Sequence, residues 1–332
     1  MNSQQGLRVV FRVAAGPGIG YGHLVRCGVL SRVLDSTMQV ALRAEAGAES
    51  VAGRLGWTLL PDDRSAIRDS RADLVVIDDP AREHAAPWVE LARRSGVPVA
   101  SIHDLGIGRL ASDLSIDGSL ALMPGGVQAD LQGPEFAVLD PLVGALRHHS
   151  PRRIRGRVLV ALGGGAHVHE FGPAIAAQVR RLLPRVRVVL AGGLHINQGR
   201  RAPLPAGCQW VDAPNGLAVE LARASVAVLA GGVTLYEACA LGTPVVAVSL
   251  TPEQGVTTRA FAQHGAVLNA GHIQAVDTAD RAAARITDLL TGTLDAEWLA
   301  RRGRQLVDGH GAVRVADRLR TLCAAMEHRR VA

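Results

Sequence analysis

Residues 8–27, RVVFRVAAGPGIGYGHLVRC, contain the pattern that decides the fold. The apolar run 9–15 predicts a buried parallel strand. A turn with Gly16, Gly18, Gly20 and Gly22 follows, and an apolar stretch with helical spacing begins at His23. A strand, a glycine turn and a helix together place backbone N–H groups where an anionic ligand can bind. Histidine exchanges a proton near neutral pH, so His23 is a candidate catalyst, with a capping or contact role as the alternative.

The composition bounds the class of protein. The length of 332 residues favours two domains over one. Hydrophobic residues make up 48% of the chain and aromatic residues only 3%, which is typical of tightly packed α/β layers. The formal net charge is +6, but no residue is lysine, which excludes Schiff-base and P-loop lysine chemistry. Because the arginines are scattered without aromatic stacking platforms, we expect an anionic small molecule rather than nucleic acid.

The sequence carries no signal for export or membrane insertion. The four cysteines, Cys27, Cys208, Cys239 and Cys323, form no CxxC pair and are typical of buried, reduced thiols. No signal peptide is recognisable at the start, and no apolar run approaches ~20 residues. We therefore expect a cytoplasmic protein without membrane insertion.

Strand and helix patterns alternate through the first half of the chain. Strands are predicted at 38–43, 57–60, 74–78 and 97–103, and helices at 45–55 and 81–95. Asp78 and Asp79 end one strand, and His103 and Asp104 end another. Ligands bind at such strand ends in open α/β sheets, although acidic residues there also cap helices. The region 105–145 is less regular.

A polar, basic segment at 146–157, LRHHSPRRIRGR, is typical of a linker between domains. It predicts an N-terminal domain at 1–145 and a C-terminal domain at 158–332. His148 and His149 do not indicate a metal site, because no third ligand stands at a suitable spacing.

The second half repeats the alternation of strands, glycine turns and helices. Strands are predicted at 157–162, 186–191, 208–211, 226–230 and 245–250, and helices at 170–183, 216–224, 234–241, 253–264 and about 276–328. Two halves that begin alike predict two Rossmann-like domains that face one another across a central cleft.

Several nucleotide-site motifs are absent. The opening turn is not GxGxxG, because Tyr21 and His23 occupy the positions that a third glycine would need. No two aspartates stand at i and i+2, which argues against a metal-binding DxD motif, and the GxSxG elbow of serine hydrolases is missing. We therefore expect a site without metal or cofactor that holds a diphosphate through backbone donors.

Four segments resemble the PseG/SpsG group of GT-B-like proteins, with a more distant similarity to MurG. They are GIGYGHLVRC at 18–27, GPEFAVLDP at 133–141, VLVALGGG at 158–165 and ASVAVLAGGVTLYEACALGTPVVAVSLTPEQ at 224–254. The resemblance runs from about residue 8 to about residue 270. It implies a GT-B-like fold and an enzyme that acts on a nucleoside-diphosphate sugar.

Matched by position, the resemblance implies that His23 is a general base. Around it, the candidate substrate contacts are Gly18, Gly20, Gly22, Arg26 and Asp78, and the resemblance adds Gln254. Arg26 facing the solvent is the alternative. The implied nucleotide contacts are Gly231, Gly232, Thr234 and Glu237, with Gly163, Gly164 and Gly165 on the other wall of the cleft. An ordinary first-turn glutamate is the alternative for Glu237.

Six positions depart from the family pattern. At several of them the resemblance implies a side chain that touches the sugar. They are Ala14, Gly16, Pro80, Asp140, Ala166 and Glu253. The resemblance implies hydrolysis of a nucleotide sugar, UDP-linked in the best-known member of the group, to free sugar and nucleoside diphosphate. An inverting GT-B glycosyltransferase with a small-molecule acceptor, bound by the region 105–145, is the alternative. A non-catalytic nucleotide-sugar binding protein is the third hypothesis, and it predicts that replacing His23 changes no assay.

Overall fold

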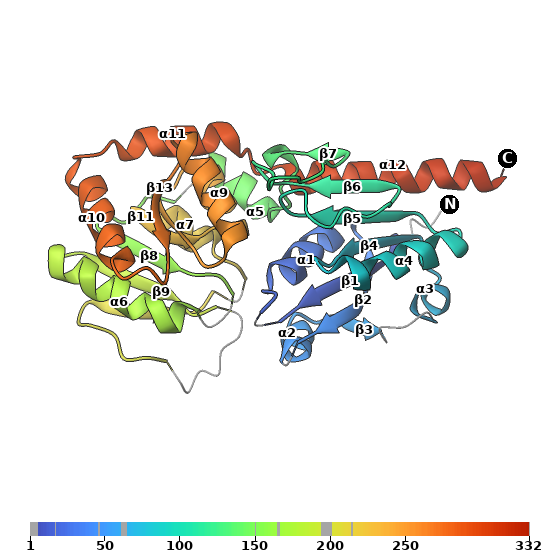
Figure 1. The fold of residues 1–332 in the computed structure, drawn as a ribbon, viewed down its shortest axis with the longest axis horizontal. Helices are drawn as coiled ribbons and strands as arrows, with labels where there is room; N and C mark the ends of the chain where they lie inside the picture. The colour runs from blue at the N-terminus through green and yellow to red at the C-terminus, as the bar shows by residue number, and fades with distance from the viewer. Residues whose placement is uncertain are drawn as a thin grey trace. The chain divides into compact units, whose positions relative to one another are not determined.

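The computed structural model describes residues 6–16, 18–45, 47–60, 65–149, 151–164, 167–193, 201–213 and 215–331. It divides the chain into two compact units. Unit 1 is Met1–Asp140 with His310–Ala332, and unit 2 is Pro141–Gly309. In each unit, helices pack on a sheet whose strands all pair in parallel (Figure 1). The predicted α/β class with two Rossmann-like domains is confirmed.

Unit 1 is built around a parallel sheet of strand order β3-β2-β1-β4-β5-β6-β7. Its strands are β1 (Arg8–Ala15), β2 (Thr37–Ala44), β3 (Thr58–Leu60), β4 (Leu74–Asp78), β5 (Val99–His103), β6 (Leu114–Asp117) and β7 (Leu131–Gln132). Its helices are α1 (Gly22–Leu34), α2 (Ala48–Arg54), α3 (Ser65–Ser70), α4 (Arg82–Arg94), the 3-10 turn η1 (Pro134–Phe136) and α12 (Gly311–Val331). Because β1 lies between β2 and β4, the strand order reverses at β1 and β4, which is where such sheets bind ligands.

The central strands of unit 1 are buried on both faces. Every residue of β4 and β5 is buried, which explains the continuous apolar run at 74–77 in β4. Trp88 and Val89 of α4 pack in the same core as Val75 and Ile77 of β4. This packing fixes the carboxyl ends of the two strands, where the acidic residues stand.

Unit 2 repeats the architecture with the strand order β10-β9-β8-β11-β12-β13. Its strands are β8 (Arg157–Ala161), β9 (Arg187–Ala191), β10 (Cys208–Val211), β11 (Val226–Ala230), β12 (Val245–Ser249) and β13 (Leu268–His272). Its helices are α5 (Pro141–His148), α6 (His167–Leu182), α7 (Ala218–Arg223), α8 (Val233–Leu241), α9 (Pro252–Gln263), α10 (Thr278–Thr291) and α11 (Ala296–Leu306). Here the strand order reverses at β8 and β11.

The segment 146–157, predicted as a linker, is part of unit 2. Residues up to His148 continue helix α5, and the Arg147 guanidinium donates to the carbonyls of Ala240, Arg304 and Val307. Ile154 donates its backbone N–H to the carbonyl of Arg223. The segment is basic because its arginines donate hydrogen bonds to main-chain carbonyls of unit 2. In this it differs from a linker whose charges face solvent. The boundary between the units is at 140/141.

The C-terminal helix also differs from the predicted division of the chain, because it belongs to unit 1. Helix α12 packs against α1, and Arg320 donates to the carbonyl of Val33 in that helix at 2.6 Å. Gly311 lies so close to Ala137 that a Cβ would come within 2.2 Å of its carbonyl oxygen. An amphipathic pattern predicts that a helix packs, but does not specify which sheet it packs on. Within the described residues, α12 and the other helices are all too short or too polar to cross a membrane.

Candidate active site

The glycine turn after β1 positions His23. Gly16 and Gly20 exchange two backbone hydrogen bonds, of 3.2 and 2.7 Å, and Gly20 has a φ of +96°, which glycine adopts without strain. Helix α1 begins at Gly22, so His23 lies in its first turn. The side chain of His23 is 14% exposed. The turn therefore presents a partly accessible imidazole at the carboxyl end of β1.

A carboxylate of the chain itself occupies part of this glycine turn. The N–H of Gly18 donates to Glu45 Oε2 at 2.6 Å. A Cβ on Gly16 would lie 2.2 Å from Cβ of Glu45, so the side chain of Glu45 packs directly on the turn. Of the predicted substrate contacts, the N–H of Gly18 is therefore engaged by an internal anion.

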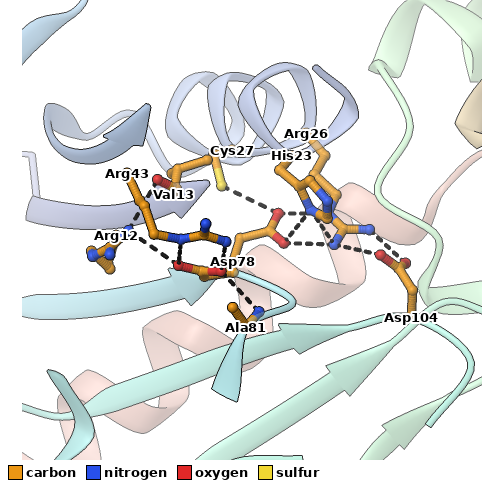
Figure 2. Close-up of polar contacts among 10 residues, drawn as sticks. Arg12, Val13, His23, Arg26, Cys27, Arg43, Asp78, Ala81 and Asp104 are labelled. Atoms are coloured by element: carbon orange, nitrogen blue, oxygen red, sulfur yellow. Dashed lines mark hydrogen bonds and ion pairs between the residues drawn. The ribbon is translucent and has the colours of Figure 1, made fainter. Parts of the chain in front are cut away.

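Asp78, at the end of β4, joins His23 to Arg26 (Figure 2). His23 Nδ1 lies 2.7 Å from Asp78 Oδ1. Arg26 donates from Nη2 to the same oxygen and from Nε to Oδ2, each at 2.6 Å. Asp78 is fully buried. Both of its oxygens are thus held by side chains of α1, and Asp78 lies in position to orient His23 rather than to meet a ligand directly.

The charges of this cluster decide which nitrogen of His23 carries the proton. Burial by itself raises the pKa of Asp78, but Arg26 and His23 outweigh it and hold that pKa below its usual range. An ionised carboxylate only accepts hydrogen bonds, so His23 Nδ1 donates to it and Nε2 keeps its lone pair. Arg26 Nη2 lies 3.1 Å from Nδ1 because both donors converge on Asp78 Oδ1. The arrangement leaves Nε2 able to accept a proton.

Asp104 binds the outer side of Arg26. Arg26 Nη1 donates to Asp104 Oδ1 at 2.7 Å and Nη2 donates to Oδ2 at 2.9 Å. The Asp104 side chain is half exposed, whereas Arg26 is 8% exposed as a residue. The alternative that Arg26 faces solvent is therefore wrong. Burial lowers the pKa of Arg26, but Asp104 and Asp78 more than compensate, so the guanidinium stays charged.

The neighbouring acid, Asp79, belongs to a different cluster. It accepts two hydrogen bonds from Arg43, at 2.7 and 2.6 Å, and forms an ion pair with Arg12 at 3.3 Å. The Arg12 guanidinium stacks on Trp88 of α4. Successive side chains of an extended segment point to opposite sides, so Asp79 points away from the side that Asp78 faces. Of the two acids at the end of β4, only Asp78 contacts His23.

In unit 2, the predicted nucleotide contacts lie at the start of α8, which follows β11. Gly232 is the N-cap residue of α8, and neither a side-chain cap nor an acidic first-turn residue accompanies it in the described structure. A Cβ on Gly231 would lie 2.7 Å from the carbonyl oxygen of Gln254, whereas one on Gly232 would meet no atom within 4 Å. Gly231 is thus required by packing against α9, and Gly232 leaves the helix terminus open.

The remaining predicted contacts of unit 2 surround the same edge of its sheet. Thr234 and Glu237 are half-buried on α8. Gln254 Oε1 accepts from the backbone N–H of Leu250 at 3.1 Å and so stabilises the turn between β12 and α9. Gly163, with φ +81°, and Gly164 follow β8. Gly165 and Ala166 lie outside the described residues.

The sequence reasoning missed the link between Asp78, Arg26 and Asp104. One signal could have found it: His23 and Arg26 are three residues apart and share one face of a helix. That helix follows β1, which neighbours the strand ending in Asp78.

The comparisons with known proteins agree with this architecture. No family model matches the chain. In sequence, it is 30% identical over 199 residues to the spore coat polysaccharide biosynthesis protein SpsG of Bacillus subtilis (strain 168), a match that spans 58% of this chain and 58% of SpsG.

Solved structures with the same fold include glycosyltransferases. The kitacinnamycin glycotransferase has a TM-score of 0.66 and 18% identity, with 96% of this chain and 99% of that chain covered. MurG of Acinetobacter baumannii has a TM-score of 0.64 and 15% identity, with 95% and 99% covered. Spinosyn rhamnosyltransferase SpnG, complexed with thymidine diphosphate, has a TM-score of 0.64 and 18% identity, with 95% and 100% covered. The chain therefore has the GT-B fold of these glycosyltransferases, and its sequence is similar to SpsG over 58% of the length of each protein.

Proposed function

We propose that this chain is a metal-independent enzyme that acts at the anomeric carbon of a nucleoside-diphosphate sugar, with hydrolysis as its reaction. The observation that carries the proposal is the contact of 2.7 Å between His23 Nδ1 and the buried, ionised Asp78. It gives a partly exposed imidazole the tautomer that a general base requires. Sequence similarity to SpsG and the fold shared with nucleotide-sugar enzymes support the choice of substrate.

In the proposed reaction, water attacks the anomeric carbon as His23 Nε2 takes one of its protons. The new bond joins the water oxygen to that carbon, and the bond from the carbon to the diphosphate oxygen breaks. The nucleoside diphosphate leaves with the electron pair. Asp78 then stabilises the imidazolium that has formed, as the carboxylate of a catalytic triad does.

Unit 2 is proposed to bind the diphosphate through the first turn of α8. Backbone N–H groups and the positive end of the helix dipole stabilise the charge that develops on the leaving group. Gly232 allows close approach, because a Cβ there would meet none of the described atoms within 4 Å and the described residues provide no side-chain cap. A diphosphate stabilised in this way is a good leaving group, so one base is the remaining requirement.

Transfer to a small-molecule acceptor is the second candidate, and one observation in unit 1 favours it. A hollow of about 350 Å³ is lined by Arg82 and by segments 106–109 and 123–127. It lies in the region that the sequence associates with an acceptor, and the exposed side chains of Ile107 and Val127 give it apolar walls. In a transferase, His23 would take the proton from an acceptor hydroxyl or amine instead of from water.

The test is release of nucleoside diphosphate from UDP-, dTDP-, GDP- and CDP-sugars without acceptor, for the parent, His23→Ala and His84→Ala. His84 is an exposed histidine of α4 and serves as the matched control. Release that only His23→Ala abolishes supports the hydrolase. Slow release, together with a nucleotide that raises the melting temperature, supports the transferase, and addition of hydroxyl or amine acceptors then accelerates release. If no sugar nucleotide is cleaved and none raises the melting temperature, both candidates are wrong.

A further inference from the structure

We propose that Arg26 and Asp104 are positioning residues that set the tautomer and the basicity of His23 through Asp78. The inference rests on the proposed role of His23 as a base and adds residues for which the family resemblance implies no such role. Among the described contacts, Asp78 is the residue whose carboxylate oxygens bind both His23 and Arg26.

The geometry fixes Asp78 from two directions. Arg26 holds one carboxylate oxygen of Asp78 with Nε and the other with Nη2. The same guanidinium uses Nη1 and Nη2 to bind Asp104. A planar guanidinium with two forked contacts leaves Asp78 no freedom to rotate, whereas a lysine ammonium could not make all of these bonds at once. Asp78 Oδ1 is therefore presented to His23 Nδ1 in one orientation.

Asp104 is itself held by a constrained turn. Leu105, the next residue, has a φ of +59°, a conformation that costs a non-glycine residue energy. Its backbone N–H donates to Ser119 Oγ at 2.8 Å, and the N–H of Gly106 donates to Asp117 Oδ2 at 2.6 Å. Bonds from β6 and the residues after it thus keep this turn in place and aim Asp104 at Arg26.

The charges around His23 come from three elements. Asp78 of β4, Arg26 of α1 and Asp104, directly after β5, are charged near neutral pH. Burial raises the pKa of the Cys27 thiol and lowers the pKa of His103, so these two neighbours are uncharged there. One cation therefore faces two carboxylates, and the cluster has one excess negative charge that a proton on His23 would cancel.

This balance predicts opposite effects for the two positions. Without Arg26, two uncompensated carboxylates favour a proton on His23, so its titration midpoint rises. Without the charge of Asp104, the remaining Arg26–Asp78 pair is neutral, and a proton on His23 adds an unbalanced positive charge beside Arg26. The midpoint then falls, and by less, because Asp104 is half exposed and screened by solvent.

The experiment follows the imidazole of His23 by ¹⁵N NMR in the ligand-free full chain, with His23→Ala to assign its signals. The variants are Arg26→Gln, Arg26→Lys and Asp104→Asn. Arg43→Gln is the matched control, because Arg43 forms the equivalent ion pair with Asp79 in the neighbouring cluster. We expect Nδ1–H in the parent, a higher midpoint in Arg26→Gln and a lower one in Asp104→Asn, with no change in Arg43→Gln.

Arg26→Lys separates charge from geometry. It keeps the cation, so the midpoint stays near that of the parent, but it loses the forked contacts, so kcat falls about 10–100-fold with little change in KM. If Arg26→Gln fails to fold, Asp104→Asn and Arg26→Lys carry the test. The inference is overturned if the His23 midpoint shifts in the same direction in Arg26→Gln and Asp104→Asn, or shifts in neither. It is also overturned if Nε2 carries the proton in the parent. Because NMR needs no turnover, a failure of the proposed base appears separately, as undiminished release by His23→Ala.

Discussion

Two adjacent glycines before α8 have opposite steric surroundings, and this contrast yields a sharp prediction. A Cβ on Gly231 would lie 2.7 Å from the backbone oxygen of Gln254 and 2.9 Å from Cγ2 of Thr258. A backbone oxygen cannot rotate away, so Gly231→Ala forces the start of α9 to move. Overpacking of this kind costs about 2–3 kcal/mol. For a unit of this size the melting temperature falls by roughly 2–4 °C per kcal/mol, which gives a loss of about 4–12 °C.

Gly232→Ala is the matched control. Its Cβ would meet none of the described atoms within 4 Å, and its φ of −106° and ψ of −164° suit alanine. We expect a melting temperature equal to or slightly above that of the parent, because alanine restricts the unfolded chain. If α8 binds the diphosphate as proposed, the added methyl group stands in the path by which the diphosphate approaches the helix terminus. The rise in melting temperature caused by nucleoside diphosphate should therefore shrink in Gly232→Ala.

Thermal unfolding followed by circular dichroism, with and without nucleoside diphosphate, measures both effects. An unchanged melting temperature in Gly231→Ala would refute the packing argument. A full ligand-dependent rise in Gly232→Ala would refute the assignment of the diphosphate to α8.

Three further predictions concern charge and burial. Asp78→Asn should lower the free energy of unfolding by about 3–5 kcal/mol at pH 7, because it breaks a buried ion pair. Burial raises the pKa of Asp78, but Arg26 outweighs it and holds this pKa below its value in the unfolded chain. The stability difference between parent and Asp78→Asn therefore persists above about pH 5 and shrinks as the pH falls below ~4. Urea unfolding at pH 7 and pH 3.5 measures this difference, and an equal loss at both pH values would contradict the reasoning. Burial raises the pKa of Cys27 and Cys239, and raises that of Cys323 to about 11. A thiol reagent at pH 8 should therefore label these three cysteines at least about tenfold more slowly in the native protein than in urea. Equal labelling rates would show that the thiols are exposed. Arg147→Ala leaves three main-chain carbonyls without their donor and should destabilise unit 2 by about 2–4 kcal/mol in urea unfolding. Arg147→Lys should restore only part of the lost stability. Full restoration by lysine would contradict a role for the forked guanidinium.

The local elements were predictable because their signals are short-range. Continuous apolar runs predicted β4 at residues 74–78, as observed, and the glycine turn at 16–22 predicted the start of α1 to within one residue. Such patterns depend on the burial of strands in a parallel sheet and on backbone conformations that glycine adopts. Both are properties of a few consecutive residues.

Partners distant in sequence were not predictable in the same way. The sequence placed Asp78 and Asp79 together at one strand end and named Asp78 as a substrate contact, but only the pleat of β4 and its neighbours β1 and β5 decided that Asp78 contacts His23. The basic segment before β8 resembles a linker until Arg147 is seen to bind carbonyls far along the chain. Helix α12 has an apolar face, but the apolar pattern does not specify which element this face packs against.

The sequence by itself thus determined the α/β class, the strand–glycine turn–helix that carries His23, and the resemblance to nucleotide-sugar enzymes. The tertiary structure alone decided that Arg26 is buried between Asp78 and Asp104, that the C-terminal helix belongs to unit 1, and that Gly231 is required by packing while Gly232 is not. The reason is physical: secondary structure follows from neighbouring residues, whereas ion pairs and close backbone approaches depend on which elements the parallel sheet brings side by side.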